Sequence, residues 1–448
     1  MNNFFTKSNN ADVNYLPRII EIKKIIPHSN ADRLECVIIN GNTVIIAKGS
    51  FSVGDVAVYV PLETTLNFDF LSRNNQFEDK TLNTNSELRG FFNKHGRVRA
   101  CRLRGEPSMG FIFPFQWFTV WQPDTEIVYD FIKNNTGLEF DTVNGIKFSQ
   151  KYISRRPASN SGNMGNKNNL NLNSFDRMID SQFHFHIDTL RLDNHIDSIK
   201  PDDTVQITKK MHGTSGISAL ILTRKKLKWY NKILKKLKFD INDTVYDNIY
   251  SSRTVIKNKY INKSKRSYYP VDVWGEANKQ IAPFLIQGMT VYYEIVGYLP
   301  NNASYIQSGY DYGCNEGEYK IFIYRITLTN ANGDVFEFST QQVQEWCKKR
   351  GLNPVHELYY GKAKDIYPDL DTTQHWHEEL VQRLRTDKSF GMEEFDNECI
   401  NKVPFEGIVI RKERLGIESY KLKCFKFYEY ETDLLDKGET NIEDANNI

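Results

Sequence analysis

The chain has 448 residues, 40% of them hydrophobic and 25% charged, which suggests two or three domains with ample apolar residues for packed cores. Its 58 basic residues nearly balance 56 acidic ones, so it is not a uniformly basic nucleic-acid binder, and any such surface must be local. Six scattered cysteines without a Cys-x-x-Cys pair argue against a structural zinc site and a secreted disulfide scaffold. No signal peptide or membrane-spanning run appears, so we expect a soluble cytoplasmic protein.

The amino-terminal part, from residue 16 to about 125, contains several short strand-like runs. The sequence Asn40-Gly41-Asn42 separates two of them, 34–39 and 43–47, and is typical of a tight hairpin turn. Several short strands with turns between them favour a small barrel or sandwich.

Residues 97–104 of this part are rich in arginine and lie close in sequence to several phenylalanines. Basic and aromatic side chains together suit contact with a nucleic-acid backbone, whereas the alternative is a plain core with solvated arginines. The candidate nucleic-acid contacts here are Arg97, Arg99, Arg102 and Arg104.

A polar, asparagine-rich stretch at 160–174 divides the chain. Such a composition cannot bury enough apolar surface to offset the entropy of ordering, although an ordered surface loop is the alternative. We therefore expect an amino-terminal domain at 1–150, a flexible linker at 151–178, a second domain at 179–430 and an acidic tail at 431–448.

The run 208–216 presents a lysine after a strand, in the order Lys210-Met211-His212-Gly213. A lysine becomes a nucleophile when burial or neighbouring cations lower its pKa, and Lys209 could contribute to this. Taken alone, the tetrapeptide favours a polar turn after a strand.

Residues 225–239 form a basic amphipathic segment with Leu227, Tyr230, Leu234 and Leu237 on one helical face. The pattern favours a helix that covers its own domain with the apolar face. Docking on a duplex backbone or a membrane surface is the alternative.

Further polar residues interrupt strand-like runs downstream, and a buried charge is costly without a partner. Strand alternation places two of the lysines on one face, where they could grip a polyphosphate, and two carboxylates could hold a divalent metal. Singly, each residue is also compatible with an edge strand, a solvated face or the core. The set comprises Arg253, Glu294, Phe322, Glu406, Lys421 and Lys423.

In this order, the set resembles the covalent nucleotidyltransferases, which are RNA ligases, DNA ligases and capping enzymes, and the Lys-x-His-Gly variant is similar to the RNA ligase branch. The resemblance implies that Lys210 attacks the α-phosphate of ATP and that the nucleotide site includes Lys209, His212 and Gly213. It further implies the following roles: Arg253 contacts the ribose and the nucleic-acid 5′-phosphate, Glu294 lies near ribose and metal, Phe322 stacks on adenine, Glu406 binds the metal, and Lys421 and Lys423 contact the α-phosphate.

The amino-terminal stretch, including 27–34 and 102–105, resembles the OB-type module of Deinococcus-type and Naegleria-type RNA ligases. This resemblance implies an α+β chain. A small OB-like β-barrel that engages nucleic acid precedes a nucleotidyltransferase domain of antiparallel sheets flanked by helices.

The implied activity is that of an ATP-dependent RNA ligase of RNA repair, which joins 3′-hydroxyl and 5′-phosphate ends through lysyl-AMP with Mg²⁺ or Mn²⁺. Lys209 stands where this branch often carries Glu, which leaves GTP as an alternative nucleotide. Capping enzymes place another OB domain after the last lysine motif, for which 424–448 is too short. The other alternative is a non-catalytic RNA-binding protein.

The expected partner is RNA, as a nicked duplex or broken ends, without a membrane. A monomer is expected, in the cytoplasm or in a host cytoplasm if the protein is viral. The asparagine- and lysine-rich composition hints at a phage-like, AT-rich genome.

Overall fold

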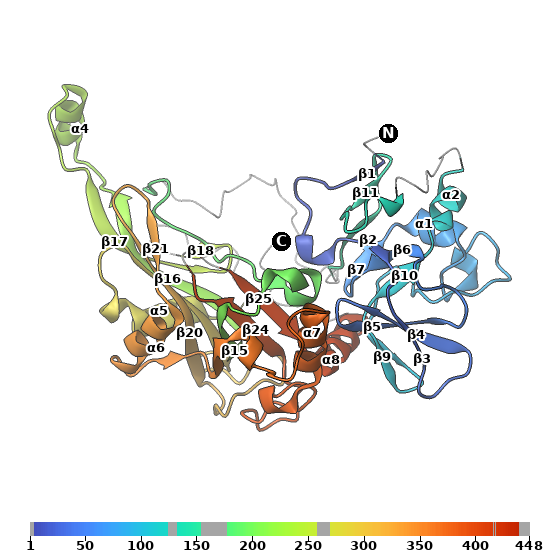
Figure 1. Cartoon of the computed structure of the whole chain (residues 1–448). Helices are drawn as coiled ribbons and strands as arrows, with labels where there is room; N and C mark the ends of the chain where they lie inside the picture. Colours follow the sequence, from blue (N-terminus) through green and yellow to red (C-terminus); the bar gives the residue numbers. More distant parts are fainter. Residues whose placement is uncertain are drawn as a thin grey trace.

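The computed structural model describes residues 4–123, 132–153, 177–257, 269–414, 416 and 418–438. Two lobes lie side by side, an amino-terminal one and a carboxy-terminal one (Figure 1). Most of the linker predicted at 151–178 and residues 439–448 of the predicted tail lie outside the described residues. No described helix has the length and apolar character needed to cross a lipid bilayer.

The amino-terminal lobe is built from short antiparallel strands and two short helices. Two three-stranded sheets, in the orders β10-β6-β2 and β3-β4-β5, form its centre, and its core is dominated by phenylalanines. In the predicted hairpin turn, Asn40 and Gly41 have φ of 50° and 77°, and asparagine and glycine tolerate this left-handed region best. The elements are β1 (Phe5–Thr6), β2 (Arg18–Glu21), β3 (Ile25–Pro27), β4 (Leu34–Ile39), β5 (Asn42–Ala47), β6 (Val56–Val60), β7 (Thr64–Leu66), α1 (Phe68–Arg73), β8 (Cys101–Leu103), β9 (Glu106–Ser108), β10 (Phe111–Phe113), α2 (Gln116–Trp121), β11 (Thr142–Val143), β12 (Ile146–Lys147) and β13 (Ser149–Lys151).

The carboxy-terminal lobe contains two larger sheets, and the α+β prediction is confirmed. One sheet has the order β14-β25-β24-β15-β23, and the other has the order β18-β17-β16-β19-β20-β21 with β22 beside β20. The elements are β14 (Leu190–Arg191), β15 (Thr204–Lys209), β16 (Thr214–Arg224), α4 (Trp229–Lys236), β17 (Thr244–Ser252), β18 (Ile256–Lys257), α5 (Val273–Ile281), β19 (Met289–Gly297), β20 (Tyr319–Thr329), β21 (Val335–Glu337), α6 (Thr340–Lys348), β22 (Asn353–Pro354), β23 (Glu357–Lys362), α7 (Trp376–Thr386), β24 (Gly407–Lys412), β25 (Ser419–Lys423) and α8 (Phe425–Asp436).

Helices cover one face of each large sheet. The uncovered faces of the two sheets line a cleft. Apolar residues of α5 and α6 pack on β19 and β20, and those of α7 pack on β15, β24 and β25. Ser339 begins α6 with a capping box.

Helix α4 does not cover the lobe, and this part of the sequence interpretation is wrong. It sits at the end of a hairpin formed by β16 and β17 and projects away from the body (Figure 1). Its apolar side chains are exposed, with Trp229 at 74% and Leu237 at 64%.

Helix α8 joins the two lobes, and it corrects two predictions. Phe425 and Tyr428 belong to the core of the amino-terminal lobe. Residues 431–436, which were predicted to begin an acidic tail, are the last turns of this helix. Glu429 and Asp436 of this helix pair with arginines of the amino-terminal lobe.

Carboxylates engage three of the four arginines that were predicted to contact nucleic acid, and several of these carboxylates belong to the carboxy-terminal lobe. Arg97 is 1% exposed and bonds to Asp436 at 2.8 Å. Arg99 lies 3.6 Å from Asp436 and pairs with Glu78 at 2.8 Å, and Arg102 pairs with Glu429 at 3.0 Å and Glu393 at 3.5 Å. Arg104 differs from these three, because it is exposed at the turn between β8 and β9.

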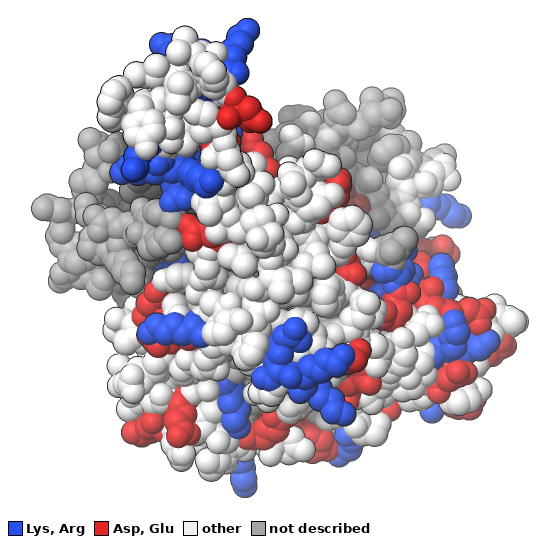
Figure 2. Space-filling view, turned by 90° about the vertical axis from the view of Figure 1, so that its left-hand side faces the viewer, with Lys and Arg blue, Asp and Glu red and all other residues white. Residues whose placement is uncertain are grey.

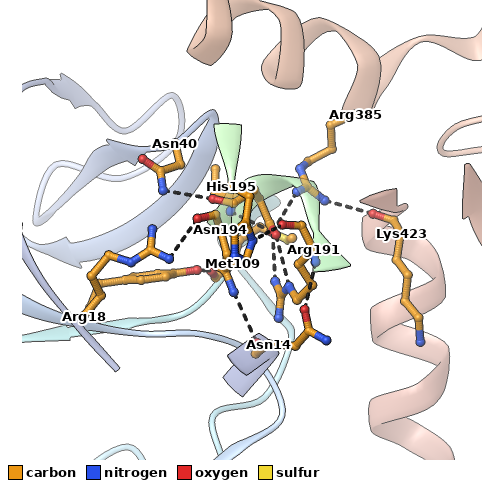
Figure 3. A network of polar contacts seen from close by, with 12 residues as sticks. Asn14, Arg18, Asn40, Met109, Arg191, Asn194, His195, Arg385 and Lys423 are labelled. Atoms are coloured by element: carbon orange, nitrogen blue, oxygen red, sulfur yellow. Dashed lines mark hydrogen bonds and ion pairs between the residues drawn. The ribbon is translucent and has the colours of Figure 1, made fainter. Parts of the chain in front are cut away.

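A buried polar network forms a second contact between the lobes (Figure 3). At its centre, Asp193 is 2% exposed and accepts hydrogen bonds from Arg191 at 2.8 and 3.1 Å, Arg385 at 3.1 Å and Asn42 at 3.0 Å. Burial alone would raise the pKa of Asp193, but Arg191 and Arg385 hold it well below its usual range. Arg385 also donates to the carbonyl of Lys423 at 2.9 Å, so the network reaches β25.

Candidate active site

Strand β15 separates the side chains of the two lysines at its end. Alternation places Val205 and Ile207 in the core, while Gln206 and Thr208 line a cavity on the other face. Lys209 follows the core side, where its ammonium bonds to acidic residues at 2.6 and 2.7 Å, and its side chain is 3% exposed. These acidic partners are Asp396 and Glu398. Lys209 is also among the residues that line the cavity, so its predicted contribution to the nucleotide site stays a prediction.

Lys210 begins the loop after β15 and lines the cavity. Its backbone N–H donates to the carbonyl of Gly407 at 2.9 Å, and its Nζ lies 2.7 Å from Oε1 of Glu406. Burial alone would raise the pKa of this carboxyl, but Lys210, His212 and Lys423 together lower it to about 2. Glu406 is thus an anion at neutral pH that holds the amine of Lys210 in place.

The next residues fix this loop against β19. A Cβ on Gly213 would lie 2.2 Å from the carbonyl oxygen of Ile295 and 3.0 Å from Cγ of Glu294, so only glycine fits. The backbone N–H of His212 donates to the Tyr312 hydroxyl at 2.8 Å. The Lys-x-His-Gly sequence thus brings the lysine beside the strand that carries a carboxylate.

The cavity lies between the uncovered faces of the two large sheets and has a volume of about 220 Å³. From the second sheet it receives Glu294, which is 9% exposed and accepts a hydrogen bond from Ser215 Oγ at 3.0 Å. Arg253 follows β17 and pairs with Asp188 on a third wall formed by residues 186–190. The structure therefore gathers Lys210, Arg253 and Glu294 around one cavity.

The two lysines of β25 share a face, as predicted, because Tyr420 and Leu422 alternate with them and are buried in the core. Lys423 Nζ bonds to both oxygens of Glu431 on α8, at 2.8 and 2.9 Å, and lies 3.7 Å from Glu406. Burial alone would lower the pKa of Lys423, but Glu431 and Glu406 raise it well above its ordinary value. Glu406 therefore connects Lys423 with Lys210.

Comparison with known proteins shows the family of the chain. The RNA ligase family model matches residues 203–427, which is half of the chain. The chain belongs to the RNA ligase family. A model of an OB-fold domain matches residues 16–115, and no curated protein matches the sequence.

Solved structures of a Naegleria gruberi RNA ligase share the fold of this ligase over nearly its whole length. The complex with pyrophosphate has a TM-score of 0.53 and 17% identity, covering 94% of this chain and 99% of that one. A mutant in the apo form has a TM-score of 0.52 and 16% identity with the same coverage. A mutant with ATP and Mn has a TM-score of 0.52 and 16% identity, covering 93% and 98%.

In this RNA ligase, the aromatic residue that was predicted to stack on adenine lies in the core of the carboxy-terminal lobe. Phe322 is 3% exposed and packs edge-on against His356. Within the described part of the chain it is not among the residues that line the cavity, whereas Tyr324 is. Tyr324 lies two residues further on the same strand face, so strand alternation would have offered it as a candidate. The stacking role of Phe322 stays a prediction.

Two carboxylates of the ligase, Glu406 and Glu294, are placed where they could bind a divalent cation. Oε2 of Glu406 is buried and has no hydrogen-bond partner within 3.5 Å among the described residues, with Nδ1 of His212 at 3.6 Å, while Glu294 stands on the cavity wall. The described residues contain no group of three metal-ligating side chains. A magnesium-like ion commonly uses one or two carboxylates and completes its shell with substrate phosphates and water.

Proposed function

We propose that this RNA ligase is ATP-dependent and joins 3′-hydroxyl and 5′-phosphate ends through a lysyl-AMP intermediate. The observation that carries the proposal is the amine of Lys210, positioned by Glu406 at a cavity that Arg253 and Glu294 also line. The solved Naegleria gruberi ligases that share its fold include complexes with ATP or AMP and Mn, which supports ATP as the nucleotide.

In the first step, Lys210 Nζ attacks the α-phosphate, and pyrophosphate leaves. Glu406 accepts a hydrogen bond from the amine and orients it, but its pKa of about 2 makes it a poor base for the lysine proton. Lys421 and Lys423 supply positive charge to the phosphates on the face of β25 where both side chains lie. A divalent cation, held by Glu294 or Glu406 and the phosphates, supplies further charge neutralisation when bound.

In the second step, AMP moves from Lys210 to the 5′-phosphate of an RNA strand. Arg253, at the cavity and outside the core, is placed to contact that phosphate. In the third step, a 3′-hydroxyl attacks the activated end and AMP departs. The 5′-phosphate alone is a poor electrophile, and the transfer of AMP from the covalent intermediate gives it a good leaving group.

We further propose that the enzyme acts as a monomer on RNA, either a nicked duplex or broken ends. One chain contributes both lobes, and the carboxylate that holds Lys423 comes from the helix that joins them. All the residues to which we assign a role in the chemistry therefore come from a single chain.

Labelling with radioactive nucleotide tests the first step. The purified protein is incubated with α-labelled ATP or GTP and Mg²⁺ or Mn²⁺, then separated on a denaturing gel. We expect a labelled protein band with ATP that disappears in Lys210→Ala and persists in Lys200→Ala, whose side chain is exposed outside the site. Labelling with GTP alone would indicate capping-type chemistry, and no label from folded protein would leave an RNA-binding protein without ligase chemistry.

A further inference from the structure

Residues 225–243, which we call the arm, form the tip of the hairpin that β16 and β17 extend from the catalytic lobe. The arm contains α4 and projects beyond the body of the molecule (Figures 1 and 2). Strand β16 starts directly after the Lys210 loop and has eleven residues. At about 3.3 Å per residue, the strand places the arm about 35 Å from the catalytic lysine.

The arm exposes aromatic and aliphatic side chains that no other part of the described chain covers. Trp229 is 74% exposed, Phe239 61% and Tyr230 43%, and Ile233 and Leu237 are 50% and 64% exposed. Several large apolar groups together on one projecting element are unusual for a protein surface and indicate a binding site.

The arm is also strongly basic. Among the arm side chains that the structure describes, six lysines are exposed, and the two acidic residues are Asp240 and Asp243. Two of the lysines pair within the arm, with Asn242 and Asp243, and Figure 2 shows basic side chains on this projection. The exposed lysines are Lys225, Lys226, Lys228, Lys235, Lys236 and Lys238.

We propose that the arm binds a single-stranded segment of the RNA substrate, at a distance from the ends that are joined. The proposal rests on the proposed function, because that activity brings a polyanion to the lobe from which the arm projects. Lysines complement the phosphates, and aromatic rings stack on bases, which works only where the bases are unpaired. A duplex offers phosphates but no free base faces for Trp229 and Tyr230.

The distance gives the proposal a length requirement. A strand must continue about 35 Å beyond the reacting end to reach the arm, which corresponds to about ten nucleotides at about 3.4 Å each. An RNA with a single-stranded extension shorter than this contacts only the cavity and its surroundings. The arm should therefore favour substrates with a long unpaired segment or loop over short ones.

Deletion of the arm tests the proposal with little disturbance of the sheet, because the residues that flank the arm are paired in the β16–β17 ladder. Arg224 and Thr244 are directly opposite in the β16–β17 register, so an Asn-Gly turn can replace 225–243. We expect the full chain to bind a single-stranded RNA of about 20 nucleotides about tenfold more tightly than the deletion variant, with little difference for an RNA of about 6 nucleotides. Labelling with ATP should be unchanged in the deletion variant, which separates a failure of this inference from a failure of the proposed function.

Point variants keep the test valid if the deletion disturbs folding. Trp229→Ala should raise the Kd for the longer RNA about tenfold, as expected for the loss of one base stack. Replacement of Lys226 and Lys238 by Gln should reduce the slope of log Kd against log salt by roughly 0.7 for each phosphate that is no longer neutralised. Glu345→Gln, an exposed helix substitution far from the arm, serves as a control and should change neither quantity.

Two results would overturn the proposal. In one, the deletion and Trp229→Ala leave the affinity for the longer RNA within about twofold of the unmodified chain. In the other, the arm determines binding to phosphatidylserine–phosphatidylcholine vesicles but not to RNA. That outcome would assign the exposed Ile233 and Leu237 to an anionic lipid surface instead.

Discussion

Replacement of Asp193 by alanine should destabilise the ligase strongly, because this carboxylate neutralises two buried cations. Asp193 bonds to Arg191 and Arg385, which are 3% and 6% exposed, and to Asn42 of the amino-terminal lobe. Alanine would leave both guanidinium groups in the interior without a carboxylate. Removal of one partner from a buried ion pair costs about 3–5 kcal/mol.

The same substitution should also change the pH dependence of stability. The pKa of Asp193 is depressed in the folded state, so its contribution is present above the ordinary pKa of an aspartate and is lost as the pH falls below it. The unmodified protein should lose more stability than Asp193→Ala between about pH 5 and pH 3. Asp193→Asn retains the size of the side chain and should give an intermediate loss.

Urea unfolding followed by tryptophan fluorescence measures these differences. Asp197→Ala is the matched control, because it lies four residues away with an 84% exposed side chain and should change the free energy of unfolding by less than about 0.5 kcal/mol. A loss below about 1 kcal/mol in Asp193→Ala would show that the network is not a charged, buried contact between the lobes.

Three further substitutions test the site itself. Gly213→Ala places a Cβ 2.2 Å from a backbone carbonyl of β19, so thermal unfolding should show a loss of about 1–3 kcal/mol, and unchanged stability would contradict the close approach. Glu406 has its pKa lowered to about 2, so it contributes on the order of 3 kcal/mol above about pH 4.5, and this is lost as the pH falls. Unfolding measured from about pH 5 to pH 3 should therefore vary less in Glu406→Gln, and an equal pH dependence would show that this carboxyl is not held as an anion. Glu431→Gln removes the carboxylate that holds Lys423 at 2.8 Å and should slow nucleotide labelling about tenfold relative to Glu429→Gln, whereas equal rates would show that this carboxylate does not position the lysine.

The sequence predicted those parts of the site that depend on local spacing. Lys210 and Gly213 lie in one short loop, and the shared face of Lys421 and Lys423 follows from the period of a strand. The same rule indicates that the side chains of Lys209 and Lys210 point to opposite faces of the sheet. It does not indicate which residues contact Lys209. Its partners, Asp396 and Glu398, are nearly 190 residues away, and no local pattern reveals such a pairing.

The interpretation of Arg97 as a nucleic-acid contact was wrong for the same physical reason, whereas the exposed Arg104 stays a candidate. An arginine beside phenylalanines is compatible with a nucleic-acid surface and with a buried ion pair, and only a distant carboxylate decides between them. For Arg97 that carboxylate belongs to Asp436, which follows it by 339 residues. Asp436 of the predicted acidic tail and Arg97 of the predicted basic surface therefore form one contact inside the protein.

This contact gives the amino-terminal lobe a structural role beside the one inferred from its arginines. Helix α8 continues directly from the strand that carries Lys423, and its residues Phe425 and Tyr428 complete the core of the amino-terminal lobe. The same helix supplies Glu431, which holds the ammonium of Lys423. Separation of the lobes would expose the two aromatic rings and disturb the helix that positions the lysine. The amino-terminal lobe therefore supports the catalytic centre through α8, while three of the four arginines at 97–104 are engaged in ion pairs with carboxylates.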